Sequence, residues 1–106
     1  MELEDTDIER LRELYINLTG RILPRLAKED GWIITSDHCF QRVVLDNVFG
    51  DIWYNHLDRN SGKPAYKQLS KDELVSAVRI SREMEKKGKE YVEELNTKSL
   101  KYRGKN

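Results

Sequence analysis

Three polar side chains stand at helical spacing inside an apolar stretch, and they are the residues best placed to do chemistry. His38, Arg42 and Asp46 follow one another at intervals of four, so on a helix they lie along one stripe. A guanidinium held by a carboxylate, with an imidazole one turn away, could bind a phosphate or carboxylate ligand. The alternative is an Arg42–Asp46 ion pair in a crowded core, with His38 hydrogen-bonded near the helix start.

The sequence predicts neither a metal site nor a cofactor. On a continuous helix His38 and His56 would be about 27 Å apart, too far to share an ion. Cys39 lies next to His38 and matches no zinc-ligand spacing, and on an apolar helix it is expected to be a small hydrophobic residue rather than a nucleophile. Neither a phosphate-binding glycine loop, a dinucleotide fingerprint nor a nucleophile elbow occurs in the sequence. A non-enzymatic function is therefore favoured.

Two basic segments indicate a different function. Each places lysines and arginines around a tyrosine, which suits a phosphate backbone with an unpaired base stacked on the ring. The alternative is a solvated loop over residues 59–71 and a frayed C-terminus. A formal net charge of zero also argues against a domain built for duplex DNA. The candidate residues are Arg59, Lys63, Tyr66 and Lys67 in the first segment, and Lys98, Lys101, Tyr102 and Arg103 in the second.

Residues 36–57, which contain His38, Arg42 and Asp46, are predicted to form a helix with no wide polar face. Ser36 can cap its start, and the apolar side chains that follow fall right round the helical circle. A helix that is apolar on all sides is expected to be central and buried. These side chains are Phe40, Val43, Val44, Leu45, Val48, Phe49, Ile52, Trp53 and Leu57.

The stretch before this central helix is also predicted to be helical, over residues 6–29. Thr6 and Glu9 match a capping box at its start, and apolar residues recur along it at spacings of three and four. Pro24 cannot donate a hydrogen bond to the carbonyl of Gly20. We therefore expect a kink or break near residues 19–23.

A third helix is predicted over residues 70–95. Ser70 and Glu73 match a second capping box. A heptad-like apolar seam then runs through residues 74–95, and self-association along this seam is expected because three helices give limited cover to a central one.

The predicted architecture is all-α, a small bundle of three main helices with a buried central helix that is apolar all round. We expect residues 1–95 to form one helical domain and residues 96–106 to form a mobile basic tail. With 106 residues, 38% hydrophobic and 36% charged, the chain is long enough for one modest core.

The composition favours a cytoplasmic protein without a membrane segment. No apolar run approaches the roughly 18 residues that a membrane span needs, and the first residues lack the pattern of a signal peptide. The single cysteine fits a reducing compartment.

Three functions follow from these patterns. The first is a small non-enzymatic interaction module whose partner is another protein or a second copy of the chain. The second is binding of nucleic acid or a polyphosphate through the basic 59–71 loop and the C-terminal tail. The third is a small enzyme or ligand-binding protein with an anion pocket around His38, Arg42 and Asp46.

Overall fold

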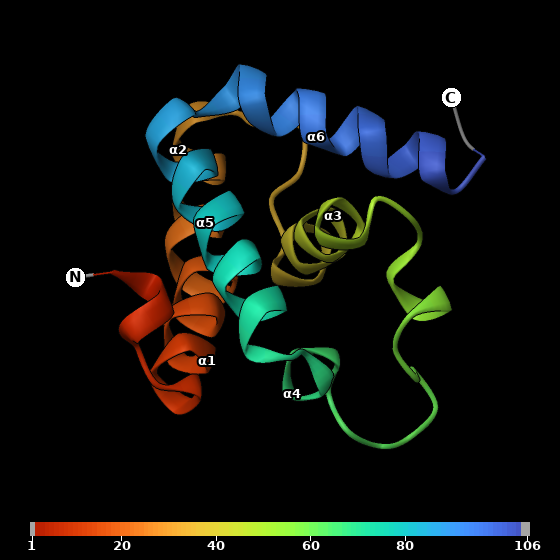
Figure 1. Cartoon of the computed structure of the whole chain (residues 1–106). Helices are drawn as coiled ribbons and strands as arrows, with labels where there is room; N and C mark the ends of the chain where they lie inside the picture. Colours follow the sequence, from red (N-terminus) through yellow and green to blue (C-terminus); the bar gives the residue numbers. More distant parts are fainter. Residues whose placement is uncertain (1, 105–106) are drawn as a thin grey trace.

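In the computed structural model, which describes residues 2–104, every regular element is a helix (Figure 1). This confirms the predicted all-α class. The elements are a 3₁₀ turn at Leu3–Asp5, α1 at Ile8–Asn17, a π-helical turn at Leu18–Ile22, α2 at Leu23–Asp30, α3 at Asp37–Phe49, a 3₁₀ turn at Trp53–Asn55, α4 at Ala65–Gln68, α5 at Lys71–Lys87 and α6 at Lys89–Tyr102. None of these helices is both long and apolar enough to cross a membrane.

The first predicted helix is present but is interrupted where Pro24 disturbs its hydrogen bonds. Residues 18–22 form a π-helical turn, and the N–H of Leu23 donates to the carbonyl of Leu18, five residues earlier. Pro24 has no N–H for the carbonyl of Gly20, so the wider turn is a way of continuing the helix past that gap. Asp7 rather than Thr6 caps the start, because its carboxylate accepts the N–H of Arg10 at 2.9 Å.

The central helix is shorter than predicted. Gly50 ends α3 in the left-handed conformation, with φ 63°, a region that glycine enters without the steric cost that other residues meet. Residues 51–57 therefore leave the helix axis and form a turn around Trp53–Asn55. The first turn of α3 also reaches the surface, because Asp37 and His38 are exposed. The buried face carries Phe40, Val43, Val44, Leu45 and Asp46.

The third predicted helix is two helices. The capping box at Ser70 is formed as expected, with the Glu73 N–H donating to Ser70 Oγ at 3.2 Å and the Ser70 N–H donating to the Glu73 carboxylate at 2.8 Å. Gly88 then separates α5 from α6 with φ 79° and ψ −150°, a conformation outside the helical region. As Figure 1 shows, α6 leaves α5 in a new direction and passes over α3.

Two expectations about the C-terminal half change with this break. Helix α6 continues to Tyr102, and Asn96 and Ser99 are buried on it, so the expected junction between domain and mobile tail at residue 95 falls inside a packed helix. The seam residues Leu74 and Met84 are buried within the same chain, because α5 packs against α1 and α3. That part of the seam is not free to receive a second copy.

Candidate functional site

A buried carboxylate joins α3 to the end of α6. Asp46 is completely buried, and both of its oxygens accept hydrogen bonds. Oδ2 accepts from Ser99 Oγ at 2.6 Å and from Arg103 Nε at 2.8 Å, while Oδ1 accepts from Arg103 Nη2 at 3.1 Å and from the N–H of Trp53 at 3.0 Å. The ion pair is therefore bidentate, a geometry that adds strength and fixes orientation.

The cation that pairs with Asp46 is Arg103. The interpretation of the sequence as an Arg42–Asp46 ion pair was therefore wrong. Arg103 lies 57 positions further along the chain and comes within reach because α6 extends past residue 95. The hydrogen bond with the Asp46 carboxylate raises the pKa of the Arg103 guanidinium. Arg103 therefore keeps its positive charge beside the buried carboxylate.

Arg42 is half-buried and contacts neutral acceptors instead. Its Nη1 donates to Ser99 Oγ and its Nη2 donates to Asn96 Oδ1, both at 2.8 Å. The Ser99 hydroxyl thus accepts from Arg42 and donates to Asp46. Asn47 adds a further link between the helices, because its amide donates to the carbonyl of Leu95 at 3.1 Å. We call Arg42, Asp46, Asn96, Ser99 and Arg103 the α3–α6 network.

His38 lies outside this network. Its side chain is 83% exposed, and its nearest charged group is Asp37, at 3.5 Å. The three side chains that the spacing placed on one stripe therefore do not converge on a common ligand position. Asp46 has no exposed oxygen and Ser99 already donates its proton to it, so neither group is free to act as a base or nucleophile in this arrangement.

A second group of side chains was not anticipated from the sequence. Phe49, Trp53, Tyr54 and His56, which we call the aromatic ridge, lie on and just after the last turn of α3. The Phe49 and His56 rings stack with centroids 4.7 Å apart and planes 4° apart, and the Trp53 and Tyr54 rings meet edge to face at 5.5 Å. Phe49, Trp53 and Tyr54 are only partly buried and His56 is exposed.

Hydrogen bonds hold the ridge in place. The Asp51 carboxylate accepts the N–H of Ile52 at 2.8 Å and contacts His56 Nε2 at 3.1 Å, and these bonds, the backbone one foremost, lower the pKa of Asp51. The bond from the Trp53 N–H to Asp46 connects the ridge to the α3–α6 network.

The predicted nucleic-acid residues fall into separate places. Arg59 and Arg103 come together, because their guanidinium carbons lie 4.0 Å and 5.4 Å from the centre of the Tyr54 ring. Tyr66 instead packs against Tyr15, with ring centroids 6.3 Å apart. The remaining residues divide between the 58–68 loop and α6: Lys63 is exposed in the loop, the backbone carbonyl of Lys67 accepts from Arg12, Lys98 pairs with Glu94, Lys101 is exposed and Tyr102 is half-buried.

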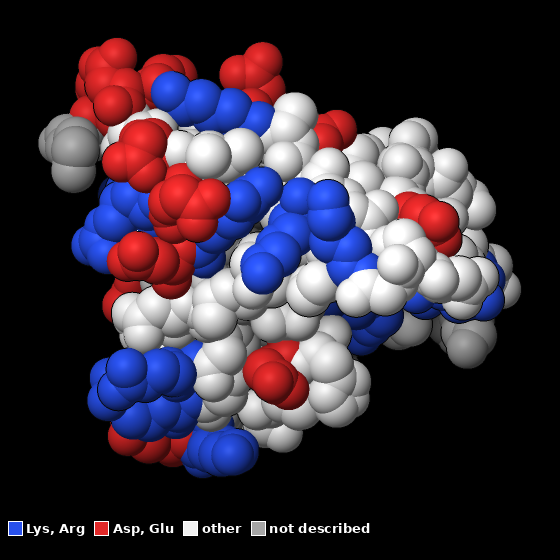
Figure 2. Space-filling view, turned by 90° about the horizontal axis from the view of Figure 1, so that it is seen from below, with Lys and Arg blue, Asp and Glu red and all other residues white. Residues whose placement is uncertain are grey.

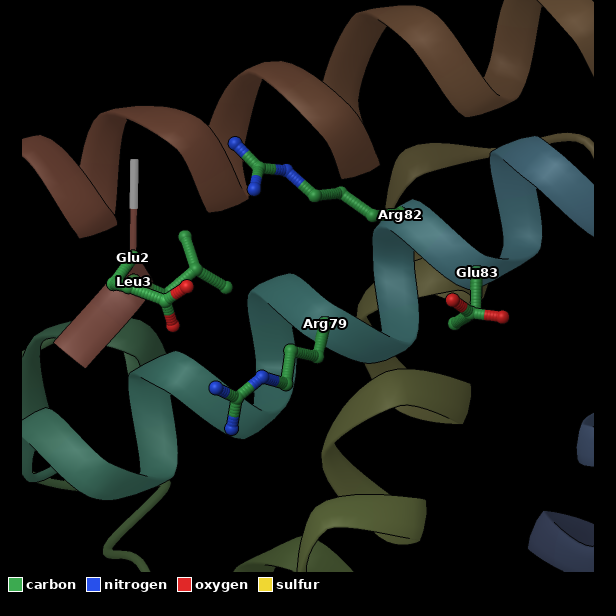
Figure 3. Close-up of a pocket in the computed structure, with 5 residues that line it drawn as sticks. All are labelled: Glu2, Leu3, Arg79, Arg82 and Glu83. Atoms are coloured by element: carbon green, nitrogen blue, oxygen red, sulfur yellow. The ribbon is translucent and has the colours of Figure 1, made fainter.

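A shallow pocket of about 350 Å³ lies between the N-terminal 3₁₀ turn and α5 (Figure 3). Glu2, Leu3, Arg79, Arg82 and Glu83 line it. Figure 3 shows the Arg79 and Arg82 side chains ending apart, with Arg82 extending in the direction of α1. Arg79 is ion-paired with Glu4, and two of the five lining residues are acids, so the charges of this pocket largely balance.

The fold and these contacts define a small all-α protein with a buried polar network and a partly exposed aromatic ridge. Within residues 2–104, no group of three or more His, Cys, Asp or Glu side chains is arranged to hold a metal ion. No protein-family model, curated protein or solved structure matches the chain. The contacts of its own residues are therefore the basis for a function.

Proposed function

We propose that the chain is a small non-enzymatic interaction module that binds a protein partner through the aromatic ridge. The observation that carries this proposal is the incomplete burial of Trp53 and Tyr54. Apolar residues on α3, such as Phe40 and Val43, are fully buried, whereas these two large rings remain partly exposed after the end of the helix at Gly50.

The composition of the ridge supports this assignment. Tryptophan, tyrosine and arginine dominate the binding energy of protein interfaces, and here Trp53 and Tyr54 lie beside Arg59 and Arg103. The ridge is also held in its conformation before any partner arrives, by the bonds of Asp46 and Asp51 to backbone N–H groups. A preformed surface loses less conformational entropy on binding.

The distribution of charge agrees with an apolar contact. Figure 2 shows most of the Lys, Arg, Asp and Glu side chains of the face seen from below over one half of the view. The other half, on the side where the chain after α3 lies in Figure 1, has more uncharged surface, with a few separate acidic and basic side chains. Interface centres are depleted in charged residues while their rims are polar. The single free cysteine, Cys39, agrees with a cytoplasmic setting for such a module.

The test compares the wild type, a Trp53→Ala/Tyr54→Ala variant and a Tyr91→Ala control as immobilised baits. Tyr91 is also a half-buried ring, but it lies on α6 beside Lys87. A genuine partner should bind the wild type and the control and be lost from the ridge variant. Titration of that purified partner should then show a loss of at least about 2 kcal/mol for the ridge variant. Equal affinity for all three baits would refute the ridge as the contact surface.

A second copy of the chain is the alternative protein partner. Sedimentation of the wild type over a wide concentration range distinguishes the two cases. A dimer that dissociates in the Trp53→Ala/Tyr54→Ala variant would identify the ridge as a homodimer contact. A monomer at all concentrations would leave a different protein as the partner.

Binding of single-stranded nucleic acid is a second candidate function, favoured by the two guanidinium groups at Tyr54 and by exposed Lys101 on α6. It predicts that a labelled oligonucleotide binds at low salt and that Arg59→Gln weakens binding and flattens its salt dependence. Absence of binding at low salt, where phosphate contacts are strongest, would exclude it.

A further inference from the structure

A pocket at the junction of α1 and α2 contains two arginines and no acidic residue. It has a volume of about 390 Å³ and is lined by Asn17, Arg21, Ile22 and Arg25. The π-helical turn Leu18–Ile22 forms part of its wall. Its charge is therefore uniformly positive, unlike that of the pocket at Arg79 and Arg82, which contains Glu2 and Glu83.

Neither arginine of this pocket is engaged elsewhere. Within residues 2–104, Arg21 and Arg25 make no side-chain hydrogen bond, ion pair or cation–π contact, and the Asn17 amide makes no hydrogen bond. By contrast, Arg10, Arg12, Arg42, Arg79 and Arg103 each make at least one side-chain hydrogen bond or ion pair. All the donors of the pocket are thus available to a ligand.

The backbone that carries these donors is fixed from the protein side. Thr19, in the same turn, is completely buried; its hydroxyl donates to the carbonyl of Tyr15 at 2.8 Å and accepts from Gln41 of α3 at 3.3 Å. Pro24 is also buried. The turn is therefore anchored to α3 on its inner side, while Arg21 in the turn and Arg25 in α2 are both exposed.

We propose that this pocket binds a doubly charged oxyanion, either inorganic phosphate or the phosphate group of a small phosphomonoester. The guanidinium fork matches phosphate oxygens two at a time, and two such forks with the amide of Asn17 can satisfy several oxygens together. The volume lies at the small end of the range of ligand pockets, which suits a phosphate with a small substituent. The site does not involve the aromatic ridge, so it stands apart from the proposed protein contact.

The proposal is tested by titrating inorganic phosphate into ¹⁵N-labelled protein and following amide chemical shifts at constant ionic strength. The Arg21→Gln/Arg25→Gln variant is compared with Arg79→Gln/Arg82→Gln, which removes the same charge from the other pocket. Saturable shifts over residues 17–25 are expected in the wild type and in the second variant. The first variant should bind about tenfold more weakly or worse, because it loses both guanidinium groups that would donate charge-assisted hydrogen bonds to the phosphate. Equal affinity in both variants, or unsaturated shifts spread over the whole protein, would overturn the proposal.

Two further measurements define the ligand class. Acetate at matched ionic strength should shift the same amides far less than phosphate, and an equal response would contradict a site for a dianion. Arg25→Lys keeps the charge but loses the planar fork, and it is expected to weaken phosphate binding while leaving the helical circular dichroism spectrum unchanged. Undiminished binding by this variant would contradict recognition by the guanidinium fork.

Discussion

The α3–α6 network makes a quantitative prediction about which arginine is energetically coupled to Asp46. Arg103 forms two bonds to the buried carboxylate and its own side chain is only 17% exposed, whereas Arg42 reaches Asp46 only through the Ser99 hydroxyl. Removal of one partner of a buried ion pair costs about 3–5 kcal/mol, because it leaves the other charge buried and uncompensated. Asp46→Ala and Arg103→Met should each destabilise by about that amount.

Double-mutant cycles separate the two arginines. The double variant Asp46→Ala/Arg103→Met should lose less than the sum of its single variants, with a coupling energy of about 2–3 kcal/mol, near the upper end for residues in one network. The matched cycle with Arg42→Met should give a coupling below about 1 kcal/mol, since Arg42 shares only Ser99 with Asp46. Both cycles exchange an arginine for a methionine and so remove the same charge.

Urea unfolding followed by circular dichroism measures these free energies, with the denaturant slopes checked for constancy across the series. A coupling of Asp46 to Arg42 that equals or exceeds its coupling to Arg103 would refute the assignment. It would show that the pair assumed from the spacing of four residues is the one formed in solution.

Three further predictions concern the C-terminus, a buried ring and a surface turn. Deleting residues 97–106 should lower the melting temperature sharply, because it removes Ser99 and Arg103 from the buried carboxylate of Asp46 at a cost of about 3–5 kcal/mol. An unchanged melting temperature would show that the helix ends near residue 95, as the sequence predicted. Burial raises the pKa of Tyr15 above its ordinary 10.0, and its hydroxyl has no hydrogen-bond partner. The free energy of unfolding should therefore be unaffected by the ionisation of Tyr15 below pH 10 and should fall as the pH rises above it. Tyr15→Phe should reduce this fall and stabilise the protein by about 1 kcal/mol, with Tyr91→Phe as the control. A destabilised Tyr15→Phe variant would contradict the burial argument. The N–H of Ile52 and the amide of Asn55 lower the pKa of Asp51 from its ordinary 3.8. The contribution of Asp51 to stability is therefore present above that pH and is lost as the pH falls, so Asp51→Asn should flatten acid unfolding in that range. An identical acid profile would show that the turn at Ile52 does not depend on the carboxylate.

Two features of the fold that local chemistry determines were predicted from the sequence, whereas the capping box expected at Thr6 was replaced by a cap at Asp7. The capping box at Ser70 depends on residues three apart, and it forms as predicted. The interruption near residues 19–23 follows from the missing N–H of Pro24, and the π-helical turn lies there. In both cases the groups that decide the structure are within one helical turn of each other, so their geometry follows from helix periodicity alone.

The helix ends at Gly50 and Gly88 were missed because glycine in a helical pattern has two opposite consequences. It either stays in the helix at a cost of about 1 kcal/mol or ends it in a conformation with positive φ. Apolar periodicity continued past both residues, and it favoured the first outcome. The choice depends on tertiary contacts: after Gly50 the Trp53 N–H binds Asp46, and after Gly88 the new direction of α6 brings Ser99 and Arg103 to the same carboxylate.

The same dependence on tertiary contacts explains why Arg42 and Asp46 contact other partners than the sequence predicted. The spacing identified Arg42 and Asp46 as polar groups in an apolar helix, but their partners Asn96, Ser99 and Arg103 are 53 to 57 residues away, a distance at which one sequence carries no pairing signal. His38 is exposed and lies beside Asp37. Arg21 and Arg25 illustrate the converse. In the sequence they are two charges on an amphipathic helix, and only the structure shows that they share a pocket without an acidic neighbour in its lining. A buried polar group is satisfied by whatever the fold brings to it, whereas a binding group is recognised by donors that the fold leaves free. By that criterion Asp46 is structural, and the open donors at Asn17, Arg21 and Arg25, together with the partly exposed rings of Trp53 and Tyr54, are the surfaces from which function should be sought.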